Sequence, residues 1–200
     1  MSSGLALRGC VILLTSCSQT SPAGNGGECT VLEYICRRQR RVVRSTFSGE
    51  LNGLIDSVEL LLVIQMCLHQ IWNPGGSNEK AIDMARQLEL GTLVPKAEAV
   101  VDARSVFDCL AATDVGELVE GSLKLHVLAL RERLLSGTLS ALWWTDTRDM
   151  LADGLTKGSV LRDQLLLACN QGIFKTIHQA AVTRCVEGKK VTAGPSIVRN

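Results

Sequence analysis

Three acidic residues stand at points of the sequence from which an α/β fold could bring their side chains together. Glu50 lies in the first turns of a predicted long helix, Asp102 follows a predicted strand, and Asp153 lies in a late helical segment. Sites in α/β proteins form at the carboxyl ends of strands, where Asp102 stands. Clustered carboxylates repel one another, and hard divalent cations such as Mg²⁺ or Mn²⁺ relieve that repulsion. These residues therefore predict a metal site, and two ions about 3.5–4 Å apart could hydrolyse a phosphodiester.

Each carboxylate also has an ordinary structural interpretation. Glu50 could be a solvated acid in the first turns of its helix, and Asp102 could cap the helix predicted over residues 103–112. Asp153 could be a surface charge. Taken singly, the three residues do not decide between these interpretations and a metal site.

A run of arginines precedes the long helix and forms the most basic part of the chain. The formal net charge is only +1, so the protein as a whole lacks the strong positive charge of many nucleic-acid-binding domains. Any such binding must come from a local patch, in which each phosphate contact would make affinity salt-dependent. The alternative is a solvated end of a hairpin. The arginines are Arg37, Arg38, Arg40, Arg41 and Arg44.

The surrounding pattern predicts an α/β fold with a mixed sheet flanked by helices. The 200 residues are 46% hydrophobic and 20% charged, which favours a single domain with one core. Ser45 or Thr46 can cap the long helix, and the Asn-Pro-Gly-Gly sequence at 73–76 ends it. Strands are expected over residues 5–14, 30–36, 97–101 and 138–144, and helices over 45–71, 79–88, 103–112, 122–135 and 146–155.

Four segments together resemble one known family. Residues 151–157 read LADGLTK, following the tryptophans Trp143 and Trp144, and residues 38–50 read RQRRVVRSTFSGE. Between them, residues 100–107 read VVDARSVF, and residues 123–133 form a predicted helix that contains His126. In this order and spacing they are similar to the carboxyl-terminal ribonuclease H region of copia-type retrotransposon polyproteins.

The resemblance implies a fold, a reaction and a set of partners. It implies a ribonuclease H-like domain over residues 1–174, followed by a tail over residues 175–200 that could be disordered. It also implies hydrolysis of the RNA strand of RNA–DNA hybrids, with Glu50, Asp102 and Asp153 as catalytic ligands of Mg²⁺ or Mn²⁺. The arginine run would contact the nucleic acid, His126 would have a structural role, and the reverse transcriptase portion of such a polyprotein is absent from this chain.

One departure from the family concerns the first catalytic carboxylate. In the family an aspartate on the opening strand commonly contacts both metal ions, whereas this chain has no aspartate before Asp56. We therefore expect the domain to lack its first strand. We also expect metal binding and catalysis to be impaired, because a metal site depends on its full set of ligands.

Other classes of protein remain as alternatives. A non-catalytic nucleic-acid-binding remnant of a retroelement would keep the arginines without hydrolysis. An exported lipoprotein or interaction protein would rest on the LTSC sequence at 14–17, but the apolar run before it is short for a signal peptide. The eight cysteines form no CxxC pair and are interpreted as free thiols. We expect an intracellular protein, cytoplasmic or nuclear, with no membrane partner.

Overall fold

A long antiparallel hairpin forms one side of the molecule. The computed structural model describes residues 7–16, 26–39, 45–73, 81–112, 114, 121–159, 162–175, 183–186 and 189–192. Strands β1 (Leu7–Thr15) and β2 (Gly27–Arg38) pair along their length, and the short β5 (Ile173–Phe174) pairs with the start of β2. The β-branched residues of β1 and β2 favour these extended segments, as the sequence predicted, whereas β5 was not predicted.

A second sheet lies beside the hairpin. Strands β3 (Glu98–Val101) and β4 (Ala141–Trp144) pair in parallel, and β4 also pairs with β6 (Thr183–Val186) in the antiparallel sense. Strand β7 (Lys189–Thr192) completes the order β3-β4-β6-β7. Both β6 and β7 come from the segment that the sequence assigned to a tail.

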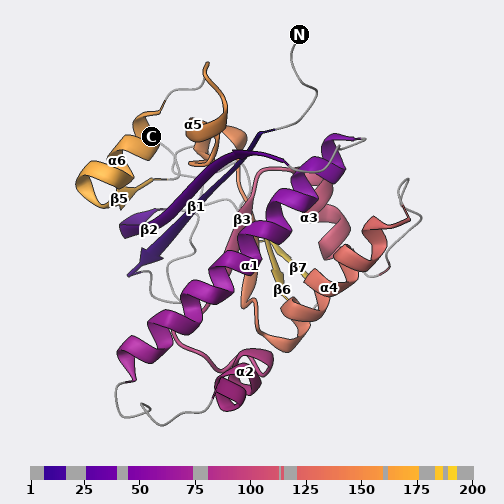
Figure 1. Cartoon of the computed structure of the whole chain (residues 1–200). Helices are drawn as coiled ribbons and strands as arrows, with labels where there is room; N and C mark the ends of the chain where they lie inside the picture. Colours follow the sequence, from indigo (N-terminus) through magenta and orange to yellow (C-terminus); the bar gives the residue numbers. More distant parts are fainter. Residues whose placement is uncertain are drawn as a thin grey trace.

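The chain is therefore a mixed α/β protein, as predicted, but its strands form two sheets. Among the described strands, β1 and β3 are edge strands that are not hydrogen-bonded to each other (Figure 1). The prediction of one mixed sheet differs from this arrangement. A periodic pattern identifies a strand, but it carries no information about the strand's hydrogen-bonded neighbour.

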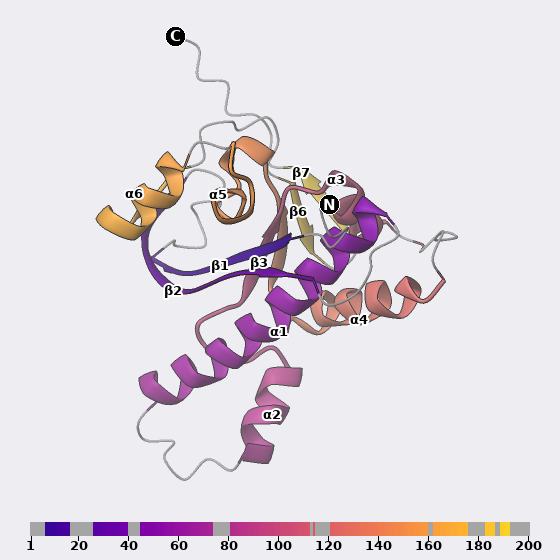
Figure 2. The same ribbon diagram turned by 45° about the horizontal axis from the view of Figure 1, so that its top comes forward.

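The long helix α1 (Thr46–Trp72) crosses the molecule diagonally, with the hairpin, α5 and α6 on one side of it and α3 and α4 on the other (Figures 1 and 2). It begins where the sequence predicted, because the Ser45 hydroxyl accepts the backbone N–H of Ser48 and the Ser48 hydroxyl accepts that of Ser45. Such a capping box stabilises a helix by about 1 kcal/mol. One face of α1 is buried at helical spacing through Leu51, Leu54, Val58, Leu62, Gln65 and His69.

The hydrophobic core lies between α1, the second sheet and two shorter helices. Phe107 on α3 and Val127 on α4 are fully buried there, together with Leu142 on β4. The remaining helices are α2 (Ala81–Glu89), α3 (Arg104–Ala111), α4 (Leu123–Ser136) and α6 (Asp163–Gln171). Among them α2, α3 and α4 agree with the predicted segments to within a few residues, whereas α6 was not predicted.

The continuous helix predicted over residues 146–155 is wrong. The structure has a 3-10 turn, η3 (Thr147–Asp149), and a separate short helix, α5 (Asp153–Thr156). The Asp146 carboxylate accepts the backbone N–H of Arg148 and starts the first turn, but Met150 has extended dihedral angles that interrupt the helix. The interruption places Asp153 at the start of a new helix.

Helix α1 also meets a simple criterion for a membrane span. By length and composition it is the one helix among the described residues that could cross a bilayer, and 28% of its most apolar window is buried inside the protein. A core helix of a soluble protein passes the same test. The regular burial of its leucines against the sheet agrees with a core role.

Candidate functional site

A cavity of about 1290 Å³ separates the hairpin from the second sheet. Strand β1 and strand β3 form its two sides, and α1 contributes a third wall through Glu50, Gly53, Leu54 and Val58. Residues from the end of β4 through η3 and α5 line one end, including Asp149, Met150 and Asp153. The cavity is larger than most small-molecule pockets, which range from about 300 to 1,000 Å³.

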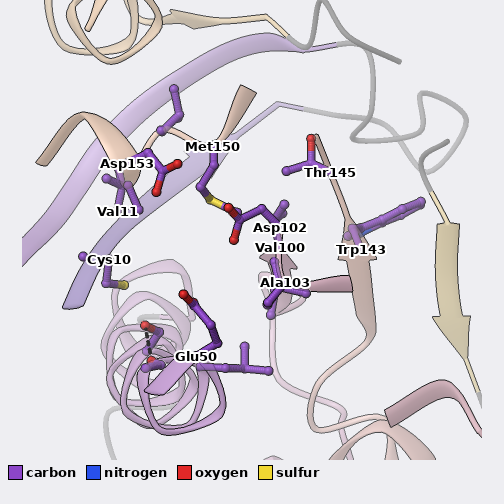
Figure 3. Close-up of a pocket in the computed structure, with 18 of the residues that line it drawn as sticks. Cys10, Val11, Glu50, Val100, Asp102, Ala103, Trp143, Thr145, Met150 and Asp153 are labelled. Carbon is purple, nitrogen blue, oxygen red and sulfur yellow. Dashed lines mark hydrogen bonds between the residues drawn. The ribbon is translucent and has the colours of Figure 1, made fainter. Parts of the chain in front are cut away.

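All three carboxylates predicted from the sequence line this cavity. Glu50 points into it from α1, Asp102 from the end of β3, and Asp153 from α5 (Figure 3). Two of the structural interpretations are excluded. The cap residue of α3 is Ala103 and makes no side-chain cap hydrogen bond, and Asp153 is only 7% exposed. Glu50 is exposed, as a solvated acid would be, but its side chain points into the cavity.

Glu50 is positioned by contacts at the start of α1. The side-chain amide of the buried Gln39, just after β2, donates to the carbonyl of Gly49 at 2.8 Å. Arg8 on β1 forms an ion pair with Asp56, two turns further along α1. These contacts fix the first turns of the helix against the hairpin, which directs Glu50 toward the cavity.

Asp102 is positioned by the junction between β3 and β4. The Trp144 indole N–H donates to the Asp102 carbonyl at 2.9 Å, and the Thr145 N–H donates to the Val101 carbonyl at 2.9 Å. The guanidinium of Arg104 lies 4.9 Å from the Trp144 ring centre, within the range of a cation–π contact. These contacts hold the backbone at the end of β3, from which the Asp102 side chain extends into the cavity.

Asp153 is held by a lysine and by the closeness of the hairpin to α5. The Lys157 ammonium donates to the Asp153 carboxylate at 2.6 Å, one helical turn away. A side-chain atom at Gly9 on β1 would stand 2.7 Å from the Ala152 carbonyl, so only glycine fits there without a shift. The Cys36 thiol on β2 donates to the Leu155 carbonyl at 3.1 Å.

The shared location perturbs the titration of these groups. Although Glu50 is exposed, the walls of the cavity shield its carboxylate from part of the solvent, and this desolvation raises its pKa. The negative charges of Asp102 and Asp153 raise the pKa further, against a lowering effect of Lys157. Burial also raises the pKa of Asp153, while its hydrogen bond from Lys157 opposes the increase. Burial lowers the pKa of Lys157, but the hydrogen bond to Asp153 and the three carboxylates raise it overall. The site therefore carries excess negative charge that a cation would relieve.

The donor set suits Mg²⁺ or Mn²⁺, but the three carboxylates do not form one coordination sphere. Within the part of the chain that the structure describes, no group of three His, Cys, Asp or Glu side chains is arranged to hold a metal ion. Carboxylate oxygens are the ligands that these ions prefer. The residues present thus fit the chemistry of the ion, but the side chains would have to approach one another, or gain a further ligand, to bind it.

Two charged residues near the carboxylates were not predicted as part of the site. Lys157 belongs to the LADGLTK segment, and its i,i+4 spacing from Asp153 could have identified it as a partner on a helix. Asp149 lines the same cavity and is buried. Its position was unpredictable because no proline or glycine marks the interruption at Met150. His126 is half-buried on α4 and lies outside the cavity lining.

The structure describes only part of the predicted arginine patch. Arg37 and Arg38 are exposed at the end of β2, opposite Arg8 and Leu7 of β1. This is the end of the hairpin that approaches α5, so both arginines lie toward the end of the cavity that holds Asp153. Arg40, Arg41 and Arg44 lie outside the described residues.

Comparison of the chain with known proteins identified no relative. No protein-family model matches the chain, no curated protein matches it, and no solved structure matches it.

Proposed function

We propose that this chain is a ribonuclease H-like domain of a retroelement, which hydrolyses the RNA strand of RNA–DNA hybrids with Mg²⁺ or Mn²⁺ and does so with impaired activity. The observation that carries the proposal is the convergence of Glu50, Asp102 and Asp153 on one cavity. They come from three elements separated by about fifty residues each, and the sequence alone predicts all three as metal ligands. The RNA–DNA hybrid and an intracellular location follow from the proposal.

In this function the protein's own residues would bind and orient the reactants. Divalent ions, when bound, supply water activation and stabilise the leaving oxygen. Glu50, Asp102 and Asp153 would hold those ions, and Lys157 would keep the Asp153 carboxylate in place while reducing repulsion. Arg37 and Arg38 are placed to contact phosphates of a duplex whose RNA strand reaches the cavity.

Low activity follows from the composition of the site. Glu50, Asp102 and Asp153 line the cavity, but within the part of the chain that the structure describes they do not form a metal-binding group. Two-metal hydrolysis requires ions held at a fixed separation. We therefore expect weak metal binding and slow cleavage.

A second candidate is a non-catalytic domain that binds nucleic acid. The specific observation in its favour is the same lack of a metal-binding group among the described residues. In this case Arg37 and Arg38 would contribute to binding, whereas the carboxylates would be dispensable.

A cleavage assay separates the two candidates. The full chain is incubated with a hybrid whose RNA strand is labelled, in Mg²⁺, in Mn²⁺ and in a chelator. The proposal expects slow, metal-dependent cleavage that is lost in Asp102→Asn and kept in Asp83→Asn, a matched change of an exposed acid on α2 outside the cavity. Cleavage that survives Asp102→Asn would contradict the proposal, since it would come from a contaminant or another site. Hybrid binding without cleavage, lost in Arg37→Ala and kept in Glu50→Ala, would favour the second candidate.

A further inference from the structure

The outer edge of β2 is open over most of its length. Strand β1 pairs with β2 on one side, whereas on the other side β5 pairs only with Gly27 and Glu28. Among the described strands, none pairs with residues 30–38 on that second side. We call this side of residues 30–38 the β2 edge. Proteins usually cover such an edge, because its unpaired backbone groups can recruit another strand. Its exposed side chains include Glu33, Tyr34, Cys36, Arg37 and Arg38.

The backbone of the β2 edge directs hydrogen-bonding groups outward. The Tyr34 N–H donates to the carboxylate of its neighbour Glu33 at 2.8 Å, so it points away from β1. The carboxylate takes the place that a carbonyl of a partner strand would occupy. Every second residue of an antiparallel strand points the same way, so the backbone groups of Cys36 also face outward. The groups available to a further strand are therefore centred on Ile35.

The side chains of the β2 edge are complementary to those of a second copy of the same edge. Successive side chains of a strand alternate between its faces, so Glu33, Ile35 and Arg37 share one face. When two copies of β2 run antiparallel about Ile35, Glu33 of each copy lies opposite Arg37 of the other. Opposite charges in directly facing positions stabilise paired strands. In the same register Ile35 faces its own copy, and Tyr34 faces Cys36.

The charges select this register over its neighbours. Outward-facing residues must meet outward-facing residues, so the alternative registers differ by shifts of two residues. A single shift in either direction places Glu33 or Arg37 opposite Ile35. A double shift places Glu33 opposite Glu33, or Arg37 opposite Arg37, and like charges in facing positions are destabilising. The register centred on Ile35 is therefore the one in which both charges find an opposite partner.

Arg37 gains most from such pairing. In the hairpin it lies opposite Arg8, whose guanidinium is already paired with Asp56 on α1. Within the part of the chain that the structure describes, Arg37 itself forms no ion pair. Its open side is the β2 edge, where a carboxylate from another strand would balance the like charge of Arg8.

We propose that two copies of the chain associate through the β2 edge, with residues 33–37 of each copy paired antiparallel about Ile35. The dimer joins two hairpins into one sheet of order β1-β2-β2-β1, and its two-fold axis makes the Glu33–Arg37 pair occur twice. Backbone hydrogen bonds provide the affinity, and side chains fix the register. Because the paired stretch is short, we expect a dissociation constant on the order of 10 µM.

This inference concerns self-association and goes beyond the proposed cleavage of hybrids. Arg37 is used in both, so dimer formation and hybrid binding through this arginine would compete. The association is therefore measured without nucleic acid and in a chelator, and its outcome does not depend on metal binding or cleavage.

Sedimentation of the full chain at increasing concentration tests the proposal. A reductant is included, because the exposed Cys36 could otherwise cross-link two copies. We expect a reversible equilibrium between monomer and dimer. Glu33→Arg and Arg37→Glu should each weaken the dimer at least tenfold, since each variant replaces both opposite-charge pairs with like-charge pairs. A wild-type chain that remains monomeric at millimolar concentration would overturn the proposal.

Mixing the two variants tests the register. The Glu33→Arg chain is basic at positions 33 and 37 and the Arg37→Glu chain is acidic at both, so a heterodimer again has two opposite-charge pairs. We expect it to form with an affinity within a few-fold of the wild-type dimer. If the variants, each folded by circular dichroism, fail to associate, the register is wrong and the proposal falls. A dimer that persists in either variant alone would place the interface on another surface.

Exposed charges outside the hairpin provide the matched controls. Glu89→Arg and Arg86→Glu on α2 make the same two changes of charge, and both chains should dimerise as the wild type does. Weakening of the dimer by these controls, to the same extent as by Glu33→Arg and Arg37→Glu, would show that net charge and not the β2 edge governs association.

A change in the backbone tests strand pairing directly. Tyr34→Pro removes an outward N–H and therefore two hydrogen bonds of the symmetric dimer, while proline is tolerated where the N–H of an edge strand faces solvent. We expect at least tenfold weaker association. Tyr34→Val keeps the N–H and the preference for a strand, so it should dimerise like the wild type. Equal weakening by both variants would assign association to the tyrosine side chain and overturn strand pairing.

Discussion

The two sides of the cavity are held in different ways. The second sheet belongs to the hydrophobic core, with Ala99, Val101 and Leu142 packed against α1, α3 and α4. Within the described residues of β1 and β2, only Ile12 and Cys29 are buried apolar residues. The hairpin is attached mainly by specific contacts near the carboxylates, such as the Arg8–Asp56 ion pair and the Gln39–Gly49 hydrogen bond. The second sheet is thus fixed by hydrophobic packing, whereas the hairpin is fixed by a few specific contacts.

The largest expected loss of stability is on the side of the cavity that belongs to the hydrophobic core. Phe107→Ala removes a fully buried ring from the core and should lower the free energy of unfolding by about 3–5 kcal/mol. Val11→Ala, a half-buried change on β1, should cost about 1 kcal/mol. Denaturant unfolding of both variants measures the difference. Equal losses would mean that the hairpin is as tightly packed as the core.

A smaller effect is expected where the hairpin approaches α5. Gly9→Ala brings a methyl group to 2.7 Å from the Ala152 carbonyl, and overpacking of this kind costs about 1–3 kcal/mol. The displacement should also move Asp153 and slow any cleavage. Gly158→Ala, at a site with open space, is the control for unfolding measurements. If Gly9→Ala matches the control, the hairpin is not held by this contact.

The charge cluster should produce a pH-dependent effect. The pKa of Glu50 is raised above its ordinary value of 4.5, so the folded protein binds this proton more tightly than the unfolded chain does. The contribution of Glu50 to stability is therefore fully present below pH 4.5 and is lost as the pH rises through the raised pKa. Glu50→Gln should raise the melting temperature by about 1–3 °C at pH 7 and have little effect at pH 4, after allowance for solvent screening. A shift that is the same at both pH values would contradict the proposed repulsion.

The smallest effect is expected at the exposed arginines. Arg37→Ala should leave stability unchanged and weaken hybrid binding several-fold, with the slope of log affinity against log salt falling by about 0.9. Titrations at several salt concentrations measure that slope. Arg86→Ala on α2, an exposed arginine far along the chain from the hairpin, should leave it unchanged. An unaltered slope in Arg37→Ala would show that this end of β2 is not part of the binding surface.

Much of the fold was predictable because local chemistry determines it. The cap at Ser45 and the spacing of Leu51, Leu54 and Val58 define α1, and a short apolar run ending at Asp102 defines β3. The sequence also predicted the three carboxylates that share one cavity, first from their places relative to the predicted helices and strand and then from the family resemblance. The separation of those carboxylates depends on side-chain positions and was not predictable.

The features that escaped prediction depend on contacts between distant segments. The pairing of β6 and β7 with β4 could not be inferred from a segment without a clear pattern. The open edges of β1 and β3 depend on which strands pair. The interruption at Met150 has no proline or glycine to signal it, and it determines where Asp149 and Asp153 lie.

The adjacent tryptophans of β4 provide the molecule with an internal optical reporter. Trp143 donates its indole N–H to the Glu98 carboxylate at 2.7 Å and Trp144 donates to the Asp102 carbonyl, so both rings are coupled to the two ends of β3. Both line the cavity, whereas the remaining tryptophan, Trp72, lies at the far end of α1. Intrinsic fluorescence should therefore respond to events in the cavity without any label. A Trp72→Phe variant would confine that emission to β4.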